Sequence, residues 1–247
     1  MYGDQIPVVI VNITNLRVAR GQSVASVTDI PLIRDPFNNV FIPSTSLKGA
    51  IRSTLYLTVG KKAFVDLIFG TAEVSENLVK PHIGLISFYD AHLVFLPVSS
   101  TIGIIYLTSP HRLNRFLSFL GVDSKTTATL INNICGYITT DNIITDYREA
   151  DKTKKINLAG GITLRVFYNS IVNDVRNILS ESLGELFSEI NQILGPINIG
   201  IVSDEVFDVI LEKAIIIRPG IKIRGFLEES ESSIREKYKD VYDCLLY

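Results

Sequence analysis

The sequence of 247 residues contains no tryptophan, one methionine and two cysteines, Cys135 and Cys244, which lie far apart. Two thiols are too few for a disulfide framework or for a zinc site of cysteines alone, so we expect two buried free thiols in a reducing cytosol. No apolar run is long enough to span a bilayer, and the N-terminus lacks the basic region of a signal peptide. These absences predict a cytoplasmic protein with no membrane partner.

Sequence motifs of several common enzyme classes are also missing. The Gly-x-Ser-x-Gly, His-Glu-x-x-His and Gly-x-Gly-x-x-Gly patterns are absent, as is the P-loop spacing. The three histidines, His82, His92 and His111, have no metal-ligand spacing and are expected to be structural. Asp90 and His92 would share one face of a strand, where a buried hydrogen-bonded pair is favoured over a catalytic dyad.

The net charge of the chain is only −2, but its basic and acidic residues are distributed unevenly along the sequence. Residues 1–62 hold seven basic and three acidic residues, whereas residues 174–247 hold eight basic and fourteen acidic residues. A polyanion would therefore bind to the first third of the chain. The same distribution is also compatible with a dipolar protein whose charged faces are simply solvated.

Apolar residues are plentiful, at 47% of the chain, which is ample for a packed core. Branched residues over 6–13 predict a buried central strand. Residues 44–59 predict a helix that is capped by a hydroxyl side chain and ended by Gly60. Within that helix Leu47, Ile51 and Leu55 recur every four residues and predict the buried stripe.

Helices and strands continue to alternate along the rest of the chain. Further helices are expected at 61–69, 110–120, 124–135, 169–194 with a break near Gly184, and 203–213, and strands at 84–97, 102–107, 162–168 and 197–202. This order is that of an α+β protein with a ferredoxin-like or RNA-recognition-motif-like core and inserted helical and β-hairpin segments.

The stretch 28–53, TDIPLIRDPFNNVFIPSTSLKGAIRS, contains a loop carboxylate that needs a chemical explanation. Asp29 precedes Pro31, which excludes it from the middle of a helix. A carboxylate on a loop beside bound RNA could hold a divalent metal ion or help to deprotonate a 2′-hydroxyl. The alternative is an ordinary turn residue.

The same stretch contains a helix start that is rich in hydroxyl and basic side chains. Free N–H groups at a helix N-terminus together with Lys48 would bind an anion such as a backbone phosphate. Arg52 lies one turn further on and stacks with Lys48 on one helix face. Simple helix capping is the alternative explanation of the hydroxyls.

Four segments carry a resemblance to a known family. IPSTSLKGAIRS resembles the IPGSSLKGxLR signature of the RAMP superfamily in CRISPR systems. TDIPLIRDP resembles the D-x-P-x-x-R-(D/E) segment of type III backbone subunits. Residues 84–116 and 201–214 resemble regions of the Cmr-branch backbone subunit, and all four segments follow the order of that family.

The resemblance implies a RAMP fold and a defined role. Family members stack as a helical filament along a guide RNA and splay the target RNA with a protruding β-hairpin. A loop aspartate, matched by Asp29, then cleaves the target with a divalent metal, Mg or Mn, by attack of a 2′-hydroxyl. The implied partners are guide RNA, target RNA, copies of the chain itself, and other type III subunits that include the large signalling subunit and small subunits.

Basic and hydroxyl side chains complete the predicted RNA interface. The predicted RNA-binding residues are Arg17, Arg20, Arg34, Ser44, Thr45, Ser46, Lys48, Arg52, Lys152, Lys154 and Lys155. We expect a single domain over 1–247 with a protruding insert near 138–168.

The sequence departs from the family pattern at three places. Arg17 stands where the family often has a histidine, and an arginine cannot act as a base. Ser44 replaces a glycine of the signature, and its Cβ limits the approach of an RNA backbone. The chain also stops after a strand predicted at 243–247, where the family normally continues, so a sheet edge would be exposed.

Two other functions are compatible with the same residues. The first is a non-catalytic guide-RNA-binding backbone subunit of a related complex. The second is a ferredoxin-like scaffold protein without any RNA function.

Overall fold

Six β-strands form the centre of the computed structural model, which describes residues 6–12, 33–36, 39–71, 82–146 and 154–214. These residues belong to one of two compact units, which comprises 1–18 and 32–215. The strands are β5 (Leu96–Ser100), β6 (Gly103–Thr108), β7 (Asn142–Thr145), β8 (Lys155–Leu158), β9 (Ile162–Tyr168) and β10 (Ile199–Ile201). The mixture of helices and strands confirms the predicted α+β class.

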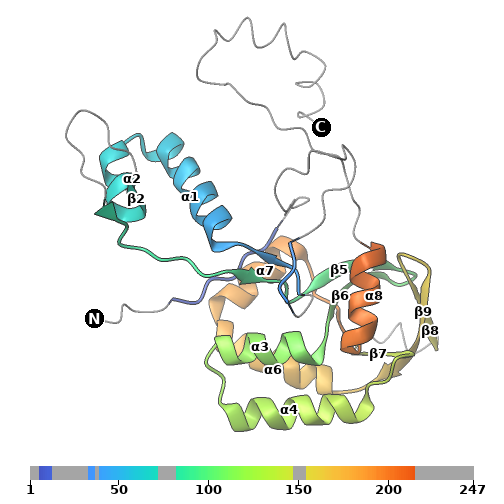
Figure 1. Cartoon of the computed structure of the whole chain (residues 1–247). Coiled ribbons are helices and arrows are strands. Elements are labelled where there is room, and N and C mark those ends of the chain that lie inside the picture. The colour runs from blue at the N-terminus through green and yellow to red at the C-terminus, as the bar shows by residue number, and fades with distance from the viewer. Residues whose placement is uncertain (1–5, 13–32, 37–38, 72–81, 147–153, 215–247) are drawn as a thin grey trace, which may run out of the picture. The chain divides into compact units, whose positions relative to one another are not determined.

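The strands close into a ring in the order β10-β6-β5-β8-β9-β7, with β7 paired back to β10. Strands β5, β6, β7, β8 and β9 are labelled in Figure 1. The pairs β10–β6 and β7–β9 are parallel, and the other four are antiparallel. Ile199 lies opposite Tyr106, and Ile144 lies opposite Phe167. Because the ring is closed, each of these six strands pairs with a neighbouring strand on both sides.

The inside of the ring is filled by apolar side chains and is covered by helix α8 (Asp204–Ala214). The buried residues of this inner cluster are Val98, Ile105, Leu107, Ile143, Ile156, Leu158, Leu164, Val202, Phe207, Ile210 and Leu211. Gly200 on β10 is required here, because an added Cβ would lie 2.7 Å from Ile143 Cδ1 and 2.8 Å from Ile105 Cγ2. The interior is therefore a packed core without room for a ligand.

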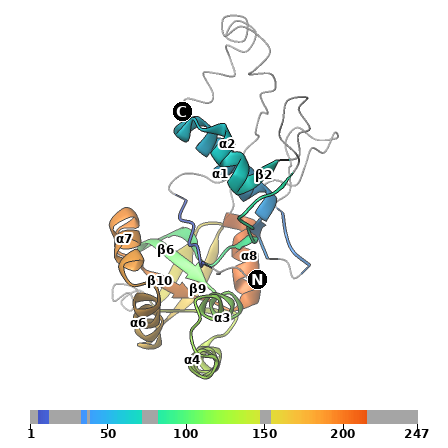
Figure 2. The ribbon, with the colours of Figure 1, turned by 90° about the vertical axis from the view of Figure 1, so that its left-hand side faces the viewer.

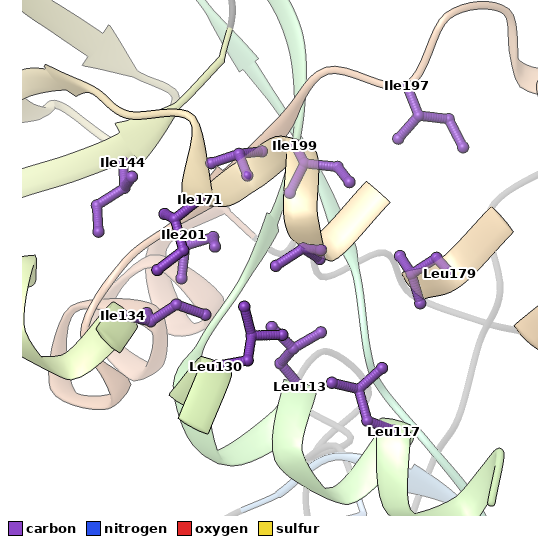
Figure 3. Packing of buried hydrophobic residues seen from close by; sticks show 12 residues of the cluster. Leu113, Leu117, Leu130, Ile134, Ile144, Ile171, Leu179, Ile197, Ile199 and Ile201 are labelled. Atoms are coloured by element: carbon purple, nitrogen blue, oxygen red, sulfur yellow. The ribbon is translucent and has the colours of Figure 1, made fainter. Parts of the chain in front are cut away.

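A second apolar cluster lies between the outer face of the ring and the helices (Figure 3). The helices are α3 (Pro110–Phe119), α4 (Ser124–Tyr137), α6 (Ile171–Leu183) and α7 (Glu185–Leu194). Ile144, Ile199 and Ile201 of the ring pack against leucines of α3 and α4. The predicted break near Gly184 is confirmed, since this residue separates α6 from α7 with a φ of 56°, a value that favours glycine.

Helices α1 (Ser44–Val59) and α2 (Lys62–Phe69) lie side by side (Figure 2). Four short strands flank them: β1 (Phe41–Ile42), β2 (Gly70–Thr71), β3 (His82–Ile83) and β4 (Ala91–His92). The predicted buried stripe on α1 is wrong, because α1 has no buried residue and Ile51 is 39% exposed. The physical reason is that α1 packs mainly on the single short helix α2.

The predicted buried strand at 6–13 is also wrong for the residues described. Residues 6–12 form no strand, and Ile6 and Val8 are 79% and 68% exposed. A strand needs a pairing partner, and no strand in the described ranges pairs with this segment. None of the helices described in the structure is both long and apolar enough to cross a membrane.

The flanks of the insert predicted near 138–168 belong to the ring. Ile143 and Ile144 on β7 and Ile156 on β8 are all buried. Residues 147–153, between these strands, lie outside the described ranges. The prediction that residues 1–247 form a single domain with a protruding insert therefore stays a prediction.

Candidate nucleic-acid interface

The N-terminus of α1 is organised by the backbone and by one acidic side chain. Pro43 is the N-cap, and its carbonyl oxygen accepts hydrogen bonds from the N–H groups of Ser46 at 2.9 Å and Leu47 at 3.0 Å. The Ser44 N–H donates to Asp90 Oδ1 at 2.7 Å. The prediction that a hydroxyl side chain caps this helix is wrong, since no side-chain cap hydrogen bond forms. The proline and the Asp90 carboxylate take that place.

The hydroxyl side chains are consequently not committed to capping. Thr45 and Ser46 are exposed, and Lys48 is half-buried one turn further along α1. The N-terminal end of a helix carries partial positive charge, which favours an anion beside these hydroxyls. Asp90 already neutralises part of that charge at Ser44.

The Arg52 side chain is held by a hydrogen-bond network that the sequence did not reveal. Its Nη2 atom lies 2.8 Å from Asp66 Oδ1 on α2, and its Nε and Nη2 atoms donate to the Tyr56 hydroxyl. The Tyr56 hydroxyl in turn donates to the same Asp66 carboxylate. The side chains of Arg52 and Asp66 are 32% and 13% exposed, so this network ties α1 to α2.

The network shifts the protonation of its members. Hydrogen bonds from Tyr56 and then Arg52 lower the pKa of the Asp66 carboxyl, although burial acts in the opposite direction. The hydrogen bond to Tyr56 is also the largest cause that raises the pKa of the Arg52 guanidinium. Both charges are therefore stabilised, and the Nε and Nη2 atoms of Arg52 are already engaged by Tyr56 and Asp66.

A turn before β1 positions Arg34. Arg34 pairs with Val40 through an isolated β-bridge, and the Asp35 carboxylate between them accepts hydrogen bonds from the backbone and side chain of Asn39. Asp35 also lies 3.8 Å from Arg115 of α3. This turn thus connects the residues that precede α1 to the helices around the ring.

His92 lies on β4 next to Arg115 of α3, and its hydrogen-bond partner is not the one that the sequence predicted. The predicted pair with Asp90 is wrong, since Asp90 binds the Ser44 N–H while Arg115 Nη2 lies 2.7 Å from His92 Nε2. Arg115 is the donor, so His92 Nε2 accepts and its neutral form is favoured. Burial, followed by the charge of Arg115, lowers the pKa of His92.

Comparison with known proteins gives a family match over most of the chain. A family model described as the RAMP superfamily matches residues 10–241. The chain belongs to the RAMP superfamily. The family resemblance noted in the sequence is thereby confirmed, and the ring with its surrounding helices is a RAMP fold.

Individual RAMP relatives narrow the comparison. The chain is 28% identical over 190 residues to the CRISPR system CMR subunit Cmr4 of Saccharolobus solfataricus, covering 74% of this chain and 59% of that protein. A crystal structure of oligomeric Cmr4 from Pyrococcus furiosus is similar with a TM-score of 0.54 and 21% identity, covering 92% of this chain and 86% of the other. A type III-B Cmr-beta structure bound to cognate target RNA matches with a TM-score of 0.53 and 18% identity, covering 81% of this chain and 66% of that one.

Several predicted RNA-binding residues of this RAMP protein lie outside the described ranges. They are Arg17, Arg20 and Lys152, and the predicted catalytic and metal-binding residue Asp29 lies outside these ranges as well. Within the described ranges, no group of three or more His, Cys, Asp or Glu side chains could hold a metal ion. The described residues therefore provide no such cluster, and the metal site at Asp29 stays a prediction.

Apart from Arg34 in the turn before β1, the remaining predicted residues of the RAMP interface fall on two separate elements. Ser44, Thr45, Ser46, Lys48 and Arg52 are brought together on α1. Lys154 and Lys155 are exposed at the start of β8, in the ring. Lys154 has a φ of 56°, an uncommon value for a residue other than glycine.

Proposed function

We propose that this chain is a backbone subunit of a type III, Cmr-branch CRISPR ribonucleoprotein that binds guide RNA and cleaves complementary target RNA. The observation that carries the proposal is the start of α1, where the signature of the RAMP superfamily places exposed Thr45 and Ser46 beside Lys48. In this proposal these groups bind the phosphate backbone of the guide. Base pairing between guide and target then supplies the sequence specificity.

The relatives support the choice of this branch. The similar proteins include a CMR subunit Cmr4 and a type III-B assembly bound to cognate target RNA. The chain spans 59% of the length of that Cmr4 relative, so the partners of the whole relative are carried over only as part of the proposal. These partners are guide RNA, target RNA, further copies of this chain and the other type III subunits.

Cleavage is assigned to Asp29. A divalent metal ion, Mg or Mn, would lower the cost of negative charge on the attacking 2′-oxygen when bound there. The Asp29 carboxylate would provide an anionic oxygen at the loop that precedes the guide-binding helix. Because Arg17 cannot accept a proton at neutral pH, the assignment does not include a second base at that position.

The experiment is a cleavage assay with the complex assembled from wild-type chain or from Asp29→Ala. We expect Asp29→Ala to retain target binding and to lose cleavage by a factor of about 100 or more, as for loss of a group that acts in the transition state. Asp35→Asn is the matched control, because that carboxylate is occupied by Asn39 and should leave cleavage unchanged.

Three outcomes separate the candidate functions. Cleavage that persists in Asp29→Ala overturns the catalytic assignment. A wild-type complex that binds guide RNA without cleaving target identifies the non-catalytic backbone subunit. A purified chain that never copurifies with RNA, measured as absorbance at the nucleic-acid maximum, identifies the scaffold protein without RNA function.

A further inference from the structure

The outer face of the hairpin β8–β9 differs from that of β6, β7 and β10. The helices α3, α4, α6 and α7 cover outward residues of β6, β7 and β10, but no residue of β8 or β9 belongs to that buried cluster. Residues of the hairpin alternate between buried and exposed positions, and Ile156 and Leu164 point into the ring. The outward residues are Lys155, Asn157, Thr163, Arg165 and Phe167, all exposed.

Two aromatic rings lie stacked at one end of this face. Tyr137 at the end of α4 stacks on Phe167 of β9, with ring centroids 5.6 Å apart and an interplanar angle of 25°. The two residues are 48% and 39% exposed, respectively. A stacked pair that stays open to solvent provides a flat apolar surface on which a further planar group can stack.

Basic side chains lie next to the rings on the same face. Lys155 and Arg165 are directly opposite each other in the β8–β9 ladder, and both are exposed. Phe167 follows Arg165 by two positions on β9, so both side chains point to the same face. Asp141 is the acidic group here: it forms an ion pair with Arg165 and accepts a hydrogen bond from the Thr139 hydroxyl.

We infer that Tyr137, Phe167, Lys155 and Arg165 form a binding site for single-stranded RNA, in which an unstacked base lies against the rings and its phosphate contacts the basic pair. Successive bases stack on aromatic side chains in many single-strand-binding proteins, where cationic groups follow the backbone. Charge complementarity selects this occupant over an apolar protein partner. The inference rests on the proposed RNA-binding function and adds to α1 a second contact surface, on the ring.

The test measures binding of a fluorescein-labelled single-stranded oligouridine to the purified full chain by fluorescence anisotropy over a range of salt concentrations. Phe167→Leu and Tyr137→Leu keep apolar bulk but remove the flat ring, and each should weaken binding by about 5- to 30-fold. Arg165→Gln should make the slope of log affinity against log salt concentration shallower, by somewhat less than the loss of one full phosphate contact would. The reason is that the ion pair with Asp141 already neutralises part of the Arg165 charge. Asp141→Asn should strengthen binding.

Phe119→Leu is the matched control, because Phe119 is also an exposed aromatic, 56% accessible, but lies at the end of α3 away from the hairpin. The Phe119→Leu variant should bind oligouridine with the same affinity as the wild type. Circular dichroism checks that each variant is folded. As a second readout, oligouridine that contains 4-thiouridine should crosslink to Tyr137 or Phe167 upon irradiation, mapped by mass spectrometry.

The outcomes separate this site from the proposed function. If the wild type binds oligouridine but the leucine variants bind equally well and crosslinks map elsewhere, this site is refuted and RNA binding stands. If leucine variants bind RNA normally but lose self-association or a protein partner, the face is a protein interface. If the wild type binds no RNA, the proposed function fails and the inference fails with it.

Discussion

The pair of Arg52 and Asp66 gives a direct test of how α1 and α2 are held together. The perturbation is a double-mutant cycle of Arg52→Gln, Asp66→Asn and the double variant. A hydrogen bond between charged groups contributes about 1.5–3 kcal/mol, and the 2.8 Å contact here is of that type. Because the Arg52 side chain is 32% exposed, solvent screening lowers the expected coupling energy to about 1–2 kcal/mol.

Urea unfolding of the four proteins, followed by circular dichroism at neutral pH, measures this coupling. The folded state lowers the pKa of Asp66, so it binds fewer protons than the unfolded state. The stabilisation is therefore fully present at pH values above the ordinary carboxyl pKa and is lost as the pH falls through the lowered value. A coupling energy below about 0.3 kcal/mol at neutral pH would refute the reasoning.

Arg165 and Asp141 provide the matched control for this cycle. They form an ion pair of the same chemical type on the hairpin β8–β9, but their side chains are 67% and 52% exposed. We expect no measurable coupling between them, because exposed charges remain solvated when separated. Equal coupling in the two pairs would show that burial does not decide the strength of the Arg52 contact.

Three further predictions concern the ring, the α3–α8 contact and the β4 junction. In urea unfolding, Gly200→Ala should destabilise the protein by about 1–3 kcal/mol through overpacking, whereas Gly136→Ala in α4 meets no atom within 4 Å and should not destabilise it. Asp208→Ala should destabilise the protein more than Arg112→Met does. The Asp208 variant leaves the Arg112 guanidinium, which is 5% exposed, without the carboxylate that lies 2.9 Å from it. The reverse order of melting temperatures in thermal unfolding would contradict this prediction. His92 has a lowered pKa, so unfolding free energy should decrease as the pH falls below about 6.5, and the decrease should be smaller in His92→Gln.

Local sequence signals predicted the helices well. The start of α1 at Ser44 and its end before Gly60 follow from a preceding proline and from a glycine that adopts a φ of 63°. The break at Gly184 between α6 and α7 has the same origin. These signals act within a few residues, so a single sequence contains them.

Contacts between distant residues were not predictable in this way. Arg112 and Asp208 are 96 positions apart, and Arg52 and Asp66 are 14 apart on different helices, so neither pair follows from helical spacing. The exposed rings of Tyr137 and Phe167 also come from separate elements. An alternation of exposed residues in ITLRVFY was the signal that could have indicated the outer face of β9.

The match to a family signature gave more information about function than the spacing and charge of the residues did. Lys48 on α1 is explained by either an anion site or a plain solvated face, and the spacing does not choose between them. The match to the RAMP superfamily over residues 10–241 establishes the family, and the anion-binding role of Lys48 stays a prediction. The role of Asp29 in cleavage is still a prediction that depends on the cleavage assay.

The closure of the ring by β10 has a consequence for biosynthesis. Residues Ile199–Ile201 pair with β6 on one side and with β7 on the other, so the ring cannot close before this segment leaves the ribosome. Strands β5 and β6 and helices α3 and α4 are made much earlier and must wait with apolar surface exposed. Closure of the ring is thus a late step that must await the synthesis of β10.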